Sequence, residues 1–441
     1  MVQTIKQLPR WGVYALLIYM PFHVFLSQWI GTSMGGLSFW KVAKDLATIV
    51  LLALTAILVL WKVPHKTWRP YASLLVLAGV YAALHIILYI INKNTTLDIA
   101  LLASGYNNRF IWILLIGIGS GLLLNTRPKQ QTIVRLVLIV STIVCLIGIL
   151  QWFLPSDVLT HFGYAKELGV KPNFFINENP NFPRIFATFR DPNSFAAYLI
   201  IPSLLLMELI RTNKRRKLSI ALLVLHLVVV YLSFSRAAWL GLLLGVSVLL
   251  FVHHRHYIQA ISRRYWPLLL SGALVMIFIT YAVRNTSTFR SIVLKADDTN
   301  ASTEMDSDEY HVFFIKEGLR DVSRRPTGYG PGTAGIVSIH NGAQGQLTEN
   351  YYVQIAHEVG ILGLAVFIAI WALVCKLLYS QEQSSLRTVL LVSAVVYAVM
   401  AMVMHLWTNE AIAFGWWGLA GLVIFTGNSH NKTSKKRMIY S

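Results

Sequence analysis

Charged residues are scarce in this sequence, and acidic residues are the scarcest of them. Only 13% of the 441 residues are Asp, Glu, Lys or Arg, against about 25% in soluble proteins, while 56% are hydrophobic. This balance excludes a soluble globular enzyme. Only two cysteines are present, Cys145 and Cys375, and both lie in apolar runs. Neither a zinc site nor a disulfide framework is therefore expected.

The few charges are strongly unbalanced, with 38 Lys and Arg against 19 Asp and Glu. In a soluble chain this excess would suggest nucleic-acid binding. A membrane protein, however, gathers basic residues in its cytoplasmic loops for topological reasons. Nine of the acidic residues lie between Arg284 and Asn350. The basic excess therefore indicates topology, and no nucleic-acid partner is expected.

Long apolar runs dominate the chain. A helix needs about 20 mostly apolar residues to cross about 30 Å of hydrocarbon. The sequence therefore predicts an all-α integral membrane protein, with residues 1–441 forming one polytopic domain of about twelve transmembrane helices. The expected spans are 11–30, 42–61, 70–91, 110–124, 133–153, 194–210, 218–234, 237–252, 267–283, 351–378, 386–406 and 410–427. The seventh and eighth spans should form a tight hairpin.

The basic residues also predict the orientation. With the N-terminus in the cytoplasm, 22 of the 38 Lys and Arg fall in cytoplasmic segments, and both termini lie inside. Lys41 and Lys44 are an exception, because they fall outside. Two long loops, 154–193 and 284–350, are then extracytoplasmic. The second should contain an amphipathic helix at the membrane interface, and loops of this length are usually functional.

Two predicted helix ends carry an arginine that could bind an anion. Arg190 precedes Asn193 at the start of the sixth span, which is either an anion site at a capped helix or an ordinary helix start. Arg236 follows Ser235 between two apolar spans. It could bind an anion there or extend its charged end to the outer headgroups.

A carboxylate marks a third helix end. Glu349 opens the tenth span, where the helix dipole favours an acid, so it is either a reactive carboxylate or a cap. His357 and Glu358 lie two turns deeper and point to different faces, which favours helix packing over a metal site. His340 is a weaker candidate. The nearby Pro326 to Gly332 segment is interpreted as a turn, since no strand precedes its glycines.

The orientation places Arg190, Arg236 and Glu349 at the outer ends of three helices, although it was derived without them. Two arginines and a carboxylate facing one outer cavity suit a reaction on a phosphorylated substrate that needs a base.

Four motifs between about residues 185 and 380 together resemble the O-antigen ligase and polymerase family of bacterial membrane glycosyltransferases. They are Asp191-Pro192-Asn193, Ser233 to Ala237, Pro326 to Gly332, and Glu349-Asn350-Tyr351 leading to Glu358 to Leu364. The resemblance implies a GT-C-like, metal-independent enzyme without cofactors. Such an enzyme moves a glycan from an undecaprenyl diphosphate carrier to an acceptor outside the cytoplasmic membrane. One departure is Glu349, where many ligases have histidine.

The resemblance also implies roles for individual residues. Arg190 and Arg236 would stabilise the departing diphosphate, while Glu349 would take the proton of the acceptor hydroxyl, with inversion of the anomeric centre. The expected partners are a polyprenyl-diphosphate-linked glycan, a glycan or glycolipid acceptor, and membrane lipids. The remaining expected substrate contacts are Ser235, Asn193, Asn350 and His340.

Three alternatives remain open at this stage. A polymerase of lipid-linked repeat units would belong to the same family as a ligase. A lipid-linked glycan flippase or other transporter should show ionisable residues at mid-membrane depth, and Glu358 is the main one. A membrane scaffold without chemistry would not explain three charged residues at the outer ends of helices.

Overall fold

The computed structural model describes residues 2–176, 179–212, 215–254, 307–344, 346 and 348–425. These residues are mostly helical, with one short antiparallel hairpin of β1 (Phe175–Ile176) and β2 (Asn179–Pro183). The main helices are α1 (Val2–Tyr19), α2 (His23–Ser33), α3 (Leu37–Lys62), α5 (Ala72–Asn92), α6 (Leu97–Leu124), α7 (Gln130–Phe153), α8 (Pro192–Tyr198), α9 (Ile200–Arg211), α10 (Arg216–Leu232), Arg236–His254, α13 (Ser307–Arg324), α14 (Tyr351–Tyr379), α15 (Ser385–Met400) and α16 (Glu410–Ile424).

The helices have the length and composition of a multi-pass membrane protein. Within the described residues, eight helices are long and apolar enough to cross a membrane, and α15 and α16 are shorter apolar helices. The all-α integral membrane class is thereby confirmed. The number twelve stays a prediction, because the expected span 267–283 lies outside the described residues. The expected hairpin is present, with Ser233 to Ser235 joining α10 to the next helix.

One helix begins well before its predicted span. The run 110–124 was expected to be a span, whereas α6 starts at Leu97. The polar residues Asn107 and Arg109 lower the hydropathy of this part of the sequence, yet both are buried. Arg109 pairs with Glu410, and Asn107 bonds to Glu358. These partners let the helix continue through the protein interior.

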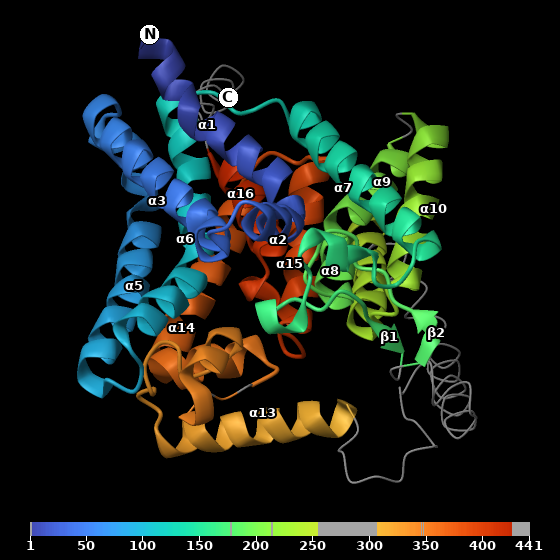
Figure 1. Ribbon diagram of the computed structural model, residues 1–441. Helices are drawn as coiled ribbons and strands as arrows, with labels where there is room; N and C mark the ends of the chain where they lie inside the picture. The colour runs from blue at the N-terminus through green and yellow to red at the C-terminus, as the bar shows by residue number, and fades with distance from the viewer. Residues whose placement is uncertain are drawn as a thin grey trace, which may run out of the picture.

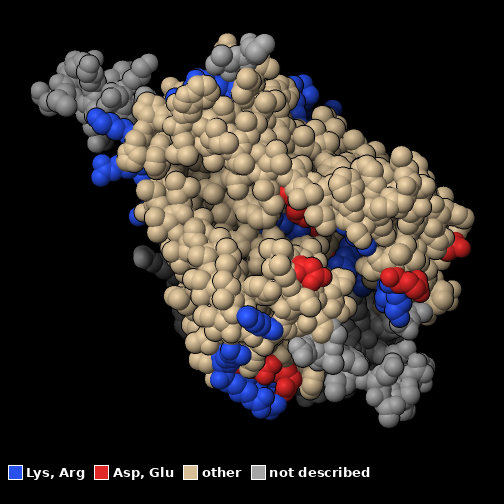
Figure 2. Space-filling view, turned by 60° about the vertical axis from the view of Figure 1, so that its left-hand side comes forward, with Lys and Arg blue, Asp and Glu red and all other residues tan. Residues whose placement is uncertain are grey.

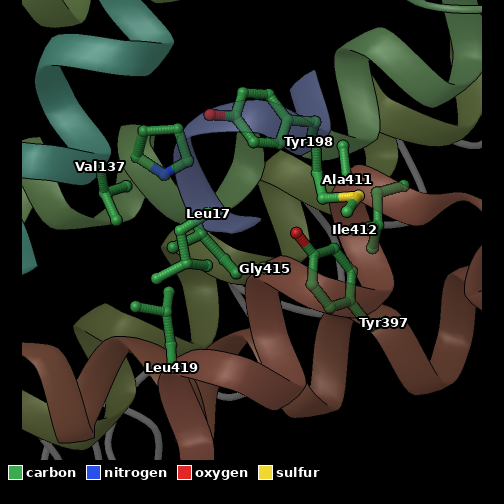
Figure 3. Close-up of a pocket in the computed structure, with 11 residues that line it drawn as sticks. Leu17, Val137, Tyr198, Tyr397, Ala411, Ile412, Gly415 and Leu419 are labelled. Atoms are coloured by element: carbon green, nitrogen blue, oxygen red, sulfur yellow. The ribbon is translucent and has the colours of Figure 1, made fainter. Parts of the chain in front are cut away.

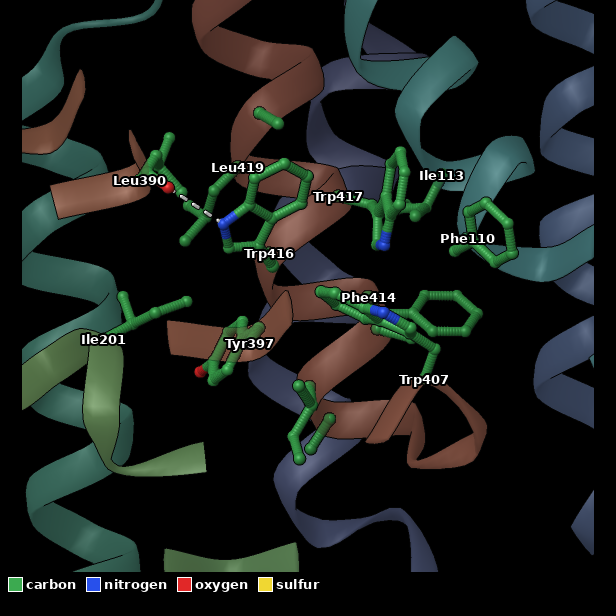
Figure 4. Close-up of a cluster of buried hydrophobic side chains, with 14 of the residues drawn as sticks. Phe110, Ile113, Ile201, Leu390, Tyr397, Trp407, Phe414, Trp416, Trp417 and Leu419 are labelled. Carbon is green, nitrogen blue, oxygen red and sulfur yellow. Dashed lines mark hydrogen bonds between the residues drawn. The ribbon is translucent and has the colours of Figure 1, made fainter. Parts of the chain in front are cut away.

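Helices α6 and α16 cross in close contact at the centre of the fold. A Cβ atom on Gly117 would lie 2.8 Å from a backbone carbon of Gly421, so the glycines permit this crossing. Next to it, Trp416 and Trp417 fill the core between α6 and α15 (Figure 4). The Trp416 indole N–H donates to the Leu390 carbonyl at 3.1 Å, which satisfies its polar atom.

The body has two distinct ends. The start of α1 lies at one end, while α13 runs across the opposite end (Figure 1). The last described residue, Phe425, lies near the first end of the body, because its carbonyl accepts a bond from Arg127 in the α6–α7 connection. A helix, α13, is present within the expected loop 284–350, and its location at a membrane interface stays a prediction. Much of the visible surface between the ends is uncharged, as a lipid-facing surface would be, although some acidic and basic residues also lie about halfway between them (Figure 2).

Candidate active site

The first site element is the start of α8. The Asp191 side chain accepts from the Ser194 backbone N–H at 2.8 Å and from its hydroxyl at 2.7 Å, so Asp191 is the helix cap. Asn193 is exposed, and its side-chain oxygen accepts from Arg184 at 3.0 Å. The carboxylate of Asp191 therefore occupies the helix end, and the arginines remain the candidates for binding an anion.

Arg184, which the sequence analysis did not identify, connects this helix to the hairpin. Its Nε donates to the Ser233 carbonyl at 2.9 Å, while its Nη2 holds Asn193. These two bonds place the start of α8 beside the turn that carries Ser235 and Arg236. Ser235 is buried there, and Arg236 is partly exposed.

Arg184 is surrounded by charges of both signs. Burial lowers the pKa of Arg184 to about 10, the nearby Asp191 carboxylate acts in the opposite direction, and the charge of Arg236 lowers the pKa further. Arg184 therefore keeps its charge at neutral pH next to a second guanidinium. Two cations so close to each other favour the binding of an anion between or beside them.

A second basic pair extends this region. Arg190 lies close enough to Lys41 of α3 for their charges to interact. The Lys41 ammonium donates to the Leu168 carbonyl at 2.8 Å, which fixes it against the 154–193 loop. Lys41 could be noticed in the sequence, since Lys41 and Lys44 are the exceptions to the cytoplasmic placement of basic residues. Nothing in the sequence distinguished Arg184 except its position in a proline-rich loop.

One helical turn further on, the charges are balanced. Lys44 lies 3.0 Å from Asp45 and 3.6 Å from Glu410, and Arg109 lies 3.1 Å from Glu410. The guanidinium also donates to the Thr408 carbonyl. This network joins α3, α6 and α16. Because each buried cation has an acidic partner, the network adds no net charge to the basic region.

Glu349 and Asn350 lie at the start of α14. The Asn350 side-chain oxygen caps α14 by accepting from Tyr352 and Val353 N–H at 2.9 and 3.0 Å. Its amide nitrogen donates to the Met402 carbonyl at 2.8 Å. Glu349 is partly exposed, with a φ of 49°. The cap of α14 is therefore Asn350 and not Glu349.

The glycine-rich segment Pro326 to Gly332 is a loop, as expected. It is hydrogen-bonded to α14 at the point where that helix is interrupted. Gly360 has φ 74° and ψ 175°, which breaks the helix. The backbone N–H groups of Tyr329 and Gly330 then donate to the carbonyls of His357 and Glu358 at 2.8 and 2.9 Å. The loop thus replaces hydrogen bonds that the helix loses, and it requires glycine where the two backbones touch.

Glu358 is fully buried and holds the same loop. One carboxyl oxygen accepts from Gly332 N–H at 2.8 Å, and the other accepts from the Asn107 amide at 2.6 Å. His357 stacks on Tyr329 with ring centroids 4.5 Å apart. The expected packing role of this pair is consistent with these contacts. His340 is exposed on η6 (Ile336–Gln344), where neighbouring Asn341 bonds to the Asn94 carbonyl at 3.3 Å.

The structure also contains a small apolar cavity between α1, α7, α8, α9, α15 and α16. Leu17, Tyr198 and Tyr397 are among its lining residues (Figure 3). Its volume of about 20 Å³ leaves room for about one water molecule. Across the described residues, no group of three or more His, Cys, Asp and Glu side chains is placed to hold a metal ion.

The fold and the charge distribution define a multi-pass helical membrane protein with a basic region at one end of the helical body. Residues 221–368 match the model of the O-antigen ligase family, so the chain carries a domain of that family and the resemblance seen in the sequence is confirmed. Members of this family are ligases and polymerases of membrane glycosyltransferase type. The match includes Arg236, Glu349 and Glu358 but not Arg184 or Arg190. No curated protein shows a significant sequence match to the chain.

Proposed function

We propose that this protein transfers a glycan from undecaprenyl diphosphate to an acceptor hydroxyl at the outer face of the cytoplasmic membrane. The observation that carries the proposal is that Arg184 interacts with Arg236, and Arg190 with Lys41, in one region around the start of α8. A diphosphate is the group of the donor that such a cluster would bind. The O-antigen ligase domain supports the same reaction class.

The arginines would act on the leaving group. As the bond between the anomeric carbon and the diphosphate oxygen breaks, negative charge develops on that oxygen. Arg190 and Arg236 would stabilise this charge, and Arg184 would hold both segments in place through Asn193 and Ser233. Donors fixed before the reaction need no reorganisation as the charge develops. This role requires no metal ion.

Glu349 would act as the base. The acceptor oxygen attacks the anomeric carbon, its proton passes to the Glu349 carboxylate, and the lipid diphosphate leaves. A single displacement of this kind inverts the anomeric centre. The capping of α14 by Asn350 supports this role, because Glu349 is not the residue that caps the helix. Ser235 and His340 are proposed to contact substrate.

The proposed topology keeps both termini in the cytoplasm, with 154–193 and 284–350 outside, in one GT-C-like domain of twelve spans. The start of α1 and the end of α16 lie at the same end of the body, and α13 lies at the other end, which supports this assignment (Figure 1). In this orientation the basic region and Glu349 face the extracytoplasmic side, where a lipid-linked glycan would be bound.

The transporter alternative loses its main support. It relied on Glu358 as an ionisable residue at membrane depth, but both oxygens of this carboxyl group bind Gly332 and Asn107 in a fixed packing arrangement. Ligase and polymerase share the chemistry proposed above and differ in the acceptor.

Product analysis by mass spectrometry tests the proposal. Purified protein is incubated with undecaprenyl-diphosphate-linked glycan and a set of glycan and glycolipid acceptors. We expect transfer by the wild type and a loss of about 10²-fold in Arg236→Ala. Arg236→Lys should fall between the two, because it keeps the charge but loses the two-pronged donor. Arg127→Ala, at the other end of the body, is the matched control. Absence of any transferred product would contradict the proposal.

A further inference from the structure

A second cavity lies next to the basic region, between the end of α7 and the hairpin of β1 and β2. Its volume is about 270 Å³. A cavity of about 150 Å³ already holds a benzene molecule, so this one has room for a six-membered ring with substituents. No role was assigned to it from the sequence, and it lies outside the segment that matches the O-antigen ligase model.

The lining of this cavity combines aromatic rings with side-chain amides. Trp152, Phe174 and Phe175 provide flat apolar surfaces, while Gln151 and Asn173 provide amide groups. A pyranose ring has the matching chemistry, with C–H groups on its faces and hydroxyl groups around its edge. Aromatic residues with a few placed polar groups are the usual lining of a specific small-molecule site.

The cavity is held in shape by contacts within its wall. The Gln151 side-chain oxygen accepts from the backbone N–H groups of Phe186 and Ala187 at 2.9 and 2.8 Å. The rings of Phe174 and Phe186 meet edge to face with centroids 5.1 Å apart. The backbone N–H of Arg184 donates to the Phe174 carbonyl at 2.9 Å. A wall fixed in this way would lose little entropy when a ligand binds.

Arg184 connects this cavity to the basic region. Its side chain lines the cavity and also bonds to Ser233 and Asn193, beside Arg236. In a diphosphate-linked glycan the first sugar is bonded directly to the diphosphate. A donor whose diphosphate lies on the arginines can therefore place a sugar ring on the other side of Arg184.

We infer that this cavity is a sugar subsite that binds a pyranose ring of the glycan. The inference rests on the proposed function for the identity of the ligand. The sugar could belong to the donor or to the acceptor, and both present the same ring chemistry. The position of Arg184 favours the donor.

Binding measurements on the full-length protein in nanodiscs test the inference. The probes are undecaprenyl diphosphate carrying one N-acetylhexosamine, the same lipid diphosphate without sugar, and the free disaccharide as a stand-in for an acceptor. Phe175→Ala and Asn173→Ala should weaken binding of the sugar-bearing lipid at least about tenfold and leave the sugar-free lipid unchanged. Weakening of the free disaccharide alone would assign the subsite to the acceptor.

The same loop offers matched controls. Phe182 and Asn181 lie exposed on β2 and do not line the cavity, so Phe182→Ala and Asn181→Ala should bind all probes as the wild type does. Equal affinities in the cavity variants and these controls would overturn the inference. So would an equal loss for the sugar-bearing and sugar-free lipids.

A second measurement does not depend on the stability of the alanine variants. In a background of Cys145→Ser and Cys375→Ser, Asn173→Cys should react with a maleimide and be protected by the sugar-bearing lipid only. Reaction at the same rate with and without that lipid would overturn the inference. If protection occurs but no glycan is transferred to any acceptor, the subsite stands and the proposed transfer reaction fails.

Discussion

Asn107 of α6 donates a hydrogen bond of 2.6 Å to Glu358 of α14, although the two residues lie 251 positions apart in the chain. The other oxygen of the same carboxyl group accepts from Gly332. One buried side chain thus joins two helices to the loop that precedes Glu349. We regard Glu358 as a residue that positions this loop against α6 and α14.

Glu358→Gln should destabilise the protein by about 1–3 kcal/mol, because the amide would turn an N–H group toward one of the two donors. The change keeps the size of the side chain, so packing is not the cause. Chemical unfolding followed by circular dichroism measures the effect. Glu167→Gln is the control, since Glu167 is exposed and should change the free energy of unfolding by less than about 0.5 kcal/mol. Equal stability of the two variants would contradict the role given to Glu358.

A second prediction concerns the stability effect of the break in α14 at Gly360. Gly360→Ala should cost about 1–3 kcal/mol for a backbone conformation that side chains avoid. A clash adds to this cost, because the new Cβ atom would lie 2.7 Å from the backbone of Thr327. Gly79→Ala is the control, since no atom lies within 4 Å of its Cβ position in α5. Thermal unfolding of both variants checks the difference, and a stable Gly360→Ala protein would show that α14 can continue unbroken.

The buried network below the basic region is expected to be sensitive to single changes. Glu410→Gln leaves Lys44 and Arg109 short of an acidic partner and should cost about 3–5 kcal/mol. Adding Lys44→Met should cost less than the two separate effects together, since both changes remove the same Lys44–Glu410 ion pair. Glu382→Gln breaks the more exposed pair with Arg127 and serves as control. Additive effects of the double variant would show that the residues act independently.

Apolar runs predicted most helices well because each run is a local property of the sequence. The expected span 351–378 became α14 (Tyr351–Tyr379), and the short hairpin after 218 formed where Ser233 to Ser235 interrupt the apolar residues. The true start of α6 was missed, since Arg109 looks polar until its partner Glu410 is known, and that partner lies 301 positions away.

The candidate site was predictable to a lesser degree. Arg190 and Arg236 stood out because charge is rare near apolar spans. Arg184 did not stand out, because its importance comes from contacts with Ser233 and Asn193 that only the fold creates. The break at Gly360 was also hidden, since its cause is a loop that lies about thirty residues earlier in the chain.

The orientation in the membrane can be tested with a matched pair of exposed lysines. Lys171 lies in the 154–193 loop, and Lys129 lies at the other end of the body, between α6 and α7. With Cys145 and Cys375 replaced by serine, an impermeant maleimide should label Lys171→Cys in intact cells. Lys129→Cys should react only after the membrane is opened. The reverse pattern would place the basic region in the cytoplasm and rule out the proposed reaction site.

The sharpest prediction concerns Glu349. As a base it should contribute about 10²–10⁴-fold to the rate of transfer, so Glu349→Gln should fold and bind the donor but transfer glycan at least about tenfold more slowly. The Gln side chain has nearly the same shape and cannot take up the proton. Glu349→His should keep more activity than Glu349→Gln, because imidazole can accept a proton.

The cap of α14 supplies the control that separates chemistry from stability. Since Asn350 and not Glu349 caps the helix, Asn350→Ala should lower stability by about 1 kcal/mol through loss of the cap, whereas Glu349→Gln keeps the cap. Rates are compared at saturating donor and acceptor, with chemistry shown to limit turnover. Near wild-type transfer by Glu349→Gln under these conditions would remove Glu349 from the mechanism. His340, exposed on η6, would then be the next base to test.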